Sequence, residues 1–135
     1  MAKKQDNRAS KGRTRARVKV QAPHSGRVVI TASMNNTIIA ITTDKGALIA
    51  ASSGGRNYKG ARKATPAAAE QAAREVGEKV KNMGMVTVVA IIRGPGSGRD
   101  AAIKGLVASG LTIITIIEAT PVPHNGCRAR KQRRI

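Results

Sequence analysis

Hydrophobic and polar residues alternate along the first half of the sequence. In residues 28–33 every second position is Val, Ile or Ala, and residues 38–43 form a second β-branched run after the turn-like sequence MNNT at 34–37. Side chains at alternate positions of a strand point to the same face, so these runs predict strands with one buried face. The sequence Asp-Lys-Gly at 44–46 predicts a hairpin turn into a third strand at 47–52.

From residue 66 to about residue 83 the apolar positions have helical spacing. Thr65 is suited to act as the N-cap, and Pro66 fits the first helical position. Gly84 predicts the end of the helix, because glycine readily adopts the left-handed conformation found there. The apolar stripe consists of Ala69, Ala72, Ala73, Val76, Val80 and Met83. Two i,i+4 ion pairs are expected on exposed faces, Glu70 with Arg74 and Glu75 with Lys79.

The second half of the chain alternates between strand and helix. The nearly continuous apolar run at 85–92 predicts a strand buried on both faces. A glycine-rich loop at 93–98 leads into a helix ending near Ser109, with Ser97 and Asp100 as its capping box. Residues 111–117 predict another buried strand. Three strands followed by helix, strand, helix and strand predict an α/β fold with a partly parallel sheet and right-handed crossovers.

The charge of the chain is high and uneven. Lys and Arg number 25 against 7 acidic residues, a formal net charge of +18. Residues 1–19 carry eight cations and one acid, and residues 127–135 carry five cations and no acid. Such a field attracts polyanions, which favours nucleic acid as the partner. We expect a basic N-terminal tail at 1–16 that is disordered until RNA binds, one α/β domain at 17–120, and a basic C-terminal tail at 121–135.

Other function classes are disfavoured by composition. Cys127 is the only cysteine, which excludes an intramolecular disulfide and is typical of a reducing compartment. No apolar run approaches the ~18 residues of a membrane span. The N-terminus lacks the apolar core of a signal peptide, so we expect a retained RNA-binding arm.

His124 and Cys127 are too few ligands for zinc. The acids outside the first helix and the arm, Asp44, Asp100 and Glu118, are too scattered for a metal-dependent nuclease. We expect no cofactor, no metal and no catalysis.

The segment RGPGSGR at 93–99 partly matches a dinucleotide-binding fingerprint. Its third glycine, Gly98, comes one position early, and Arg99 stands where a helix-packing glycine belongs. A nucleotide-dependent enzyme is therefore an alternative that the spacing disfavours. Glycines and a helix N-terminus still attract phosphate, and Arg93 and Arg99 flank this point, so an RNA phosphate is the expected ligand.

Residues 54–63 form a second glycine-rich basic loop. Its glycines, which lack side chains, let a ligand approach the backbone closely, and they are Gly54, Gly55 and Gly60. Its four cations have no acidic residue beside them in the loop, and they are Arg56, Lys59, Arg62 and Lys63. For Tyr58 two interpretations stay open: stacking on a base or sugar, or capping the edge of the core.

The pair Asn125-Gly126 suggests a chemical modification. Because the small glycine leaves the side chain open to attack by the next backbone nitrogen, we expect Asn125 to be prone to deamidation or isoaspartate formation.

Four motifs point to one family. They are MNNT at 34–37, YKGARKATP at 58–66, RGPGSGR at 93–99 and TPVPHNGCR at 120–128. In this order, and over roughly residues 17–135, the chain resembles small-subunit ribosomal protein eleven of the bacterial or organellar type. A free-standing nucleic-acid-binding module that acts off the ribosome is the alternative.

The resemblance implies both a fold and a location. The fold would be a three-layer α/β/α arrangement with a five-stranded mixed sheet, of ribonuclease-H-like topology but without its catalytic acids. The protein would lie on the platform of the small subunit, bridging rRNA helices near the Shine–Dalgarno cleft, with mRNA nearby. Its neighbours would be small-subunit proteins seven and eighteen, and initiation factor three would be a partner. The compartment would be the cytoplasm, with a mitochondrial or plastid ribosome as the alternative.

The expected RNA contacts come from two sources. The family motifs imply Asn35, Asn36, Lys59, Arg62, Lys63, Arg93, Arg99, His124, Asn125 and Arg128. Charge and glycine placement add Lys11, Arg13, Arg15, Arg17, Gly54, Gly55, Arg56, Tyr58, Gly60, Gly94, Gly96, Gly98, Arg130, Lys131, Arg133 and Arg134.

The chain departs from the family pattern at several positions. Met34 and Tyr58 stand where the family usually has Phe, and the residue near Ala50 is usually Trp. Ala61 and Ala64 replace two serines, and Ala129 and Arg130 replace prolines. With a single aromatic residue in the chain, aromatic stacking on RNA can contribute little.

Overall fold

The computed structural model describes residues 21–135. In chain order the elements are β1 (Ser25–Ala32), β2 (Thr37–Thr42), β3 (Leu48–Ser53), the short 3-10 helices η1 (Gly54–Arg56) and η2 (Gly60–Ala64), α1 (Pro66–Asn82), β4 (Thr87–Arg93), α2 (Gly98–Ala108) and β5 (Thr112–Glu118). The expected order of strands and helices is confirmed. The segment expected to be a plain basic loop contains η1 and η2. None of the helices in this part of the chain combines the length and hydropathy needed to span a membrane.

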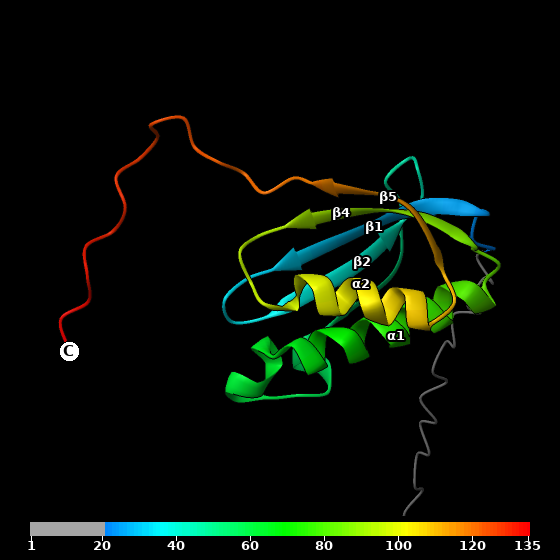
Figure 1. Ribbon diagram of the computed structural model, residues 1–135, viewed down its shortest axis with the longest axis horizontal. Helices are drawn as coiled ribbons and strands as arrows, with labels where there is room; N and C mark the ends of the chain where they lie inside the picture. Colours follow the sequence, from blue (N-terminus) through cyan, green and yellow to red (C-terminus); the bar gives the residue numbers. More distant parts are fainter. Residues whose placement is uncertain (1–20) are drawn as a thin grey trace, which may run out of the picture.

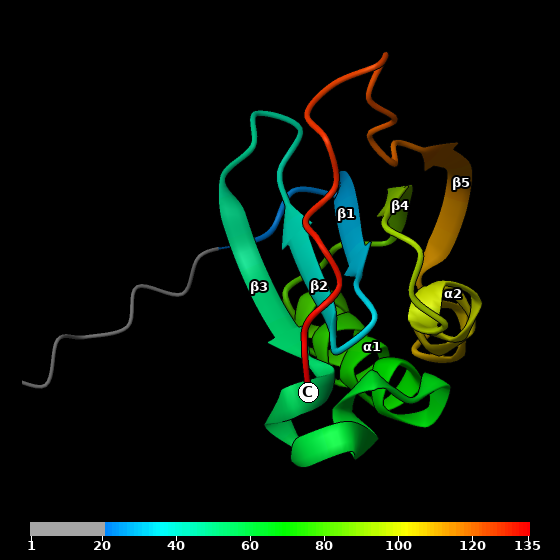
Figure 2. The same cartoon turned by 90° about the vertical axis from the view of Figure 1, so that its left-hand side faces the viewer.

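The strands form one mixed sheet in the order β3-β2-β1-β4-β5. β2 is antiparallel to both β1 and β3, whereas β4 is parallel to both β1 and β5. β1, β3, β4 and β5 therefore run in the same direction and end at the same edge of the sheet, which we call the carboxyl edge. Figure 2 looks onto this edge. The predicted α/β class and the five-stranded mixed sheet are confirmed, and the strand order fits the ribonuclease-H-like topology.

Both helices lie on one face of the sheet (Figure 1). The chain moves from β3 through α1 to β4, and then through α2 to β5, always in the same direction across the sheet. Right-handed crossovers that progress in one direction place their helices on the same side. The third layer that the resemblance implied is therefore not seen within residues 21–135.

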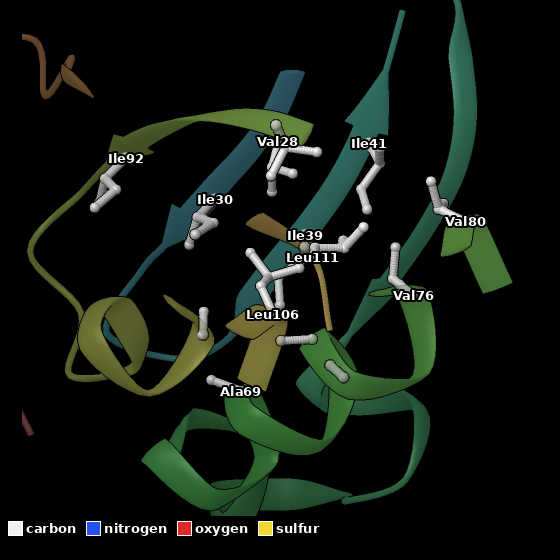
Figure 3. Close-up of a cluster of buried hydrophobic side chains, with 14 of the residues drawn as sticks. Val28, Ile30, Ile39, Ile41, Ala69, Val76, Val80, Ile92, Leu106 and Leu111 are labelled. Carbon is white, nitrogen blue, oxygen red and sulfur yellow. The ribbon is translucent and has the colours of Figure 1, made fainter. Parts of the chain in front are cut away.

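The core lies between the sheet and the two helices (Figure 3). It is built from Val, Ile and Ala, with Ile30, Ile39 and Leu106 among the fully buried side chains. The helices approach each other closely at Gly105 of α2, where an added Cβ would lie 2.7 Å from Ala73 Cβ. Small residues at this contact therefore allow the two helices to pack closely.

Both predicted ends of α1 are confirmed. Thr65 accepts a hydrogen bond from the backbone N–H of Ala68, and Pro66 starts the helix. At the other end the N–H of Gly84 donates to Lys81 and that of Met85 donates to Val80, a Schellman motif. Met83 was wrongly assigned to the apolar stripe: it is the C-cap residue and 40% exposed.

Two local predictions are wrong. Ser97 does not cap α2, because its backbone is helical and its hydroxyl donates to the Ala64 carbonyl at 3.2 Å. An N-cap side chain can reach the first turn only from an extended backbone. Glu75 pairs with Arg56 at 3.8 Å and not with Lys79. The other expected pair, Glu70 with Arg74, is present at 2.5 Å.

The outer face of the sheet is less covered than predicted. In β4 the residues facing the helices are buried, whereas the alternate residues are only half-buried. β5 is an edge strand, and Ile114 and Ile116 are 65% and 54% exposed. An apolar run does not reveal whether a second layer or a further strand covers it, so the prediction of two fully buried strands is wrong.

Candidate nucleic-acid interface

The carboxyl edge brings three of the four family motifs together, and the fourth begins beside it at Thr120. The turn after β1 carries MNNT, the segment after β3 contains η1 and η2, the loop after β4 is the GPGSG segment, and the basic tail follows β5. This gathering follows from the topology, because parallel strands joined by crossovers all end on the same side. α1 and α2 begin at this edge as well, and the partial positive charge at helix N-termini favours anions there.

Asn36 connects two of these segments. Its side-chain oxygen accepts the backbone N–H of Thr37 at 2.9 Å and that of Gly55 at 3.2 Å. Gly54 packs beneath this contact, since an added Cβ would lie 2.3 Å from the Lys63 carbonyl oxygen. The β1–β2 turn, η1 and η2 are therefore held together as one surface, and the Asn36 oxygen is committed to that task.

The GPGSG loop packs on the end of β1. The N–H of Gly96 donates to the Ala32 carbonyl at 2.9 Å. A Cβ added at Gly94 would lie 2.2 Å from the carbonyl oxygen of Ala32. One added at Gly96 would lie 2.4 Å from the carbonyl oxygen of Ser33. These glycines are thus required for the close approach of protein backbone, and their role in the structure is to shape the loop.

A polar network links this loop to the end of β5. Glu118 accepts hydrogen bonds from Arg99 and from the Thr120 hydroxyl. The same hydroxyl accepts the backbone N–H of Gly94 at 3.1 Å. Arg99, expected to contact phosphate, is therefore already engaged by a carboxylate. Sequence reasoning missed Glu118 as its partner because the two residues meet only through the β4–β5 pairing.

Arg56 is held in a similar way. Glu75 on α1 lies 3.8 Å from the Arg56 guanidinium and also accepts from the Asn57 amide and the Ser52 hydroxyl. This half-buried carboxylate anchors η1 to the helix.

Four cations of the edge have no carboxylate partner in the described part of the chain. Lys59, Arg62 and Arg93 are exposed and Lys63 is half-buried. Unpaired cations on a surface that also carries two helix N-termini are suited to bind phosphates. Tyr58 is half-buried beside them, which leaves both interpretations of its role open.

A buried polar atom lies under the start of α2. Thr37 is 1% exposed, and its hydroxyl has no hydrogen-bond partner among residues 21–135. An added Cβ at Gly98 would lie 2.2 Å from this hydroxyl, so Gly98 permits the close contact between β2 and α2.

The basic C-terminal tail extends away from this surface (Figure 1). After β5 the chain leaves the body and is exposed throughout residues 121–135, as Figure 1 shows. Asn125 has a left-handed backbone with φ of 54°. The structure does not bring His124, Asn125, Arg128 and the later cations into contact with the edge. The predicted arm at 1–16, with Lys11, Arg13 and Arg15, and the neighbouring Arg17 lie outside the described residues.

Metal binding finds no support within residues 21–135. No group of three His, Cys, Asp or Glu side chains is placed there to share an ion. Cys127 is a free, exposed thiol.

Comparison with known proteins agrees with the motifs. A family model described as ribosomal protein S11 matches residues 26–134. The chain is 45% identical, over the full length of both sequences, to a protein of Methylibium petroleiphilum named small ribosomal subunit protein uS11. The family match covers about four-fifths of the sequence, and the identity extends over all of it. The chain therefore belongs to the ribosomal protein S11 family.

Proposed function

We propose that this small-subunit ribosomal protein binds and bridges rRNA helices on the platform, where it helps to form the Shine–Dalgarno cleft and mRNA exit region. The main support for this proposal is the set of residues gathered at the carboxyl edge. Three motif segments and two helix N-termini meet on one side of the sheet, together with four cations that have no carboxylate partner among residues 21–135. One surface of this kind can contact phosphates of several RNA segments at once.

The proposed RNA-binding residues fall into three groups. Lys59, Arg62, Lys63 and Arg93 contact phosphates directly, and Arg128, Arg130, Lys131, Arg133 and Arg134 extend the contact along the tail. Asn36, Arg56, Arg99 and the loop glycines shape the surface. The N-terminal cations add further phosphate contacts.

The partners follow from the family. We propose small-subunit rRNA as the main ligand, proteins seven and eighteen as neighbours, and initiation factor three as a transient partner in a cytoplasmic ribosome. A structural role without catalysis fits this surface, because its two engaged carboxylates, Glu75 and Glu118, hold arginines in place.

Sucrose-gradient sedimentation tests the proposal. Tagged protein expressed in a bacterium should sediment with small subunits and remain there after a wash at moderate salt. A variant with Lys59, Arg62, Lys63 and Arg93 changed to Gln should shift to the top of the gradient. Wild-type protein found only at the top would support the alternative of a module that acts off the ribosome.

A further inference from the structure

A hollow of about 340 Å³ opens at the carboxyl edge between the β1–β2 turn and η2. Its volume is within the range of small-ligand sites, roughly 300–1,000 Å³. One wall is Met34 and Asn35, and the other is formed by Gly60, Ala61, Lys63 and Ala64. None of these residues is acidic.

The walls are fixed by hydrogen bonds outside the hollow. Asn36 joins the turn to Gly55 at the start of the 3-10 region. Ser97 donates to the Ala64 carbonyl at 3.2 Å and so ties η2 to the loop before α2. A site whose walls are already held in place loses less entropy when a ligand binds.

The lining combines three chemical properties. Met34, Ala61 and Ala64 are apolar, and Met34 is 73% exposed although it borders a cationic surface. The Asn35 amide offers both a donor and an acceptor. Lys63 supplies a positive charge. A flat ring with hydrogen-bonding groups at its edge and a phosphate nearby matches all three, and a thioether makes favourable contacts with aromatic rings.

We propose that this hollow holds the base of one unpaired RNA nucleotide. Met34 lies against the face of the base, Asn35 meets its edge, and Lys63 contacts the adjoining phosphate. Bases inside a paired helix are stacked and inaccessible, so the ligand is a loop or bulge nucleotide. The proposal rests on the RNA-binding function above and adds a position at which a base, and not only the backbone, is recognised.

Three of the departures from the family pattern, Met34, Ala61 and Ala64, line this same hollow. They come from segments that are more than 25 residues apart in the sequence. Together they form the apolar part of its lining, beside Asn35 and Lys63.

The test uses the full-length chain and two RNA hairpins of identical length and charge. Both carry one bulged residue, which is adenosine in the first RNA and an abasic ribose in the second. Fluorescence anisotropy at fixed salt gives the affinity for each. The wild type should prefer the bulged base by about two- to tenfold, the range of a thioether–aromatic contact.

Ala61→Leu narrows the hollow from one wall, at an exposed position and without changing charge. This variant should lose the preference while binding the abasic hairpin as the wild type does. Ala47→Leu, at the exposed turn on the opposite end of β3, is the matched control and should keep the preference. Circular dichroism confirms that both variants are folded.

Two results would overturn the proposal: equal wild-type affinity for both hairpins, or an Ala61→Leu variant that retains the preference. In either case binding of both hairpins would leave the RNA-binding function intact. Failure of the wild type to bind either hairpin at low salt would instead overturn the proposed function and the base site together.

Discussion

The side-chain oxygen of Asn36 accepts the backbone N–H of Gly55 at 3.2 Å and so joins the β1–β2 turn to η1. The same oxygen accepts the N–H of Thr37. A residue that the family motif suggested as an RNA contact therefore also assembles the surface on which RNA is expected to bind.

Replacing this side chain should lower stability. Asn36→Ala leaves two backbone donors without their acceptor, and we expect the free energy of unfolding to fall by about 1–3 kcal/mol. Urea unfolding monitored by circular dichroism measures the change. The exposed neighbour serves as the control, since Asn35→Ala should stay within about 0.5 kcal/mol of the wild type. Equal losses in the two variants would show that the Asn36 contacts are unimportant.

Releasing Arg99 should strengthen RNA binding. Glu118→Gln removes the carboxylate that engages Arg99. Because the pair is partly exposed, stability should change by less than about 1 kcal/mol. The freed guanidinium should increase affinity for an rRNA fragment and steepen the log–log salt slope by about 0.7–0.9. Glu78→Gln, an equal charge change on an exposed part of α1, is the control. Weaker binding of Glu118→Gln would mean that the ion pair positions the loop for RNA.

The C-terminal tail should contribute through charge. Deleting residues 127–135 removes five exposed cations that form no ion pair within the described part of the chain. The salt slope of rRNA-fragment binding should become shallower by up to about 0.7–0.9 for each phosphate that the tail no longer neutralises. An unchanged salt slope would show that the tail does not contact RNA phosphates.

Asn125 should convert slowly to aspartate or isoaspartate. Its side chain is exposed, its backbone is left-handed, and Gly126 follows it. Peptide mass spectrometry after incubation at mildly alkaline pH should find the modification at Asn125. Gly126→Ala should slow it, because a β-carbon hinders attack by the next backbone nitrogen. Unmodified Asn125 in the aged wild-type protein would contradict the expectation.

Much of the fold could be predicted from the sequence because its signals are local. Alternation between residues 28 and 52 marked the first three strands, and Thr65, Pro66 and Gly84 marked the ends of α1. The burial of β5 could not be predicted, since an apolar run is compatible with both an edge strand and a central strand. The role of Ser97 was missed because its hydroxyl bonds to Ala64, 33 residues away.

The candidate site was only partly predictable. The cations and glycines could be identified from composition and motif. It could not be predicted which cations lack a carboxylate partner, because the partners Glu75 and Glu118 come from other elements. The hollow beside Met34 depends on two segments that meet only in the folded chain.

The most direct measurement compares two double variants with the same loss of charge. Lys59→Gln with Lys63→Gln changes the carboxyl edge, and Lys79→Gln with Lys81→Gln changes the last turn of α1, at the opposite edge. Affinity for a small-subunit rRNA fragment is measured as a function of salt. If the carboxyl edge binds RNA, the first variant should bind more weakly, with a slope reduced by up to about 0.7–0.9 for each lysine. The second should bind nearly as the wild type does. Equal weakening of both variants would contradict the carboxyl edge as the RNA-binding face of the folded domain.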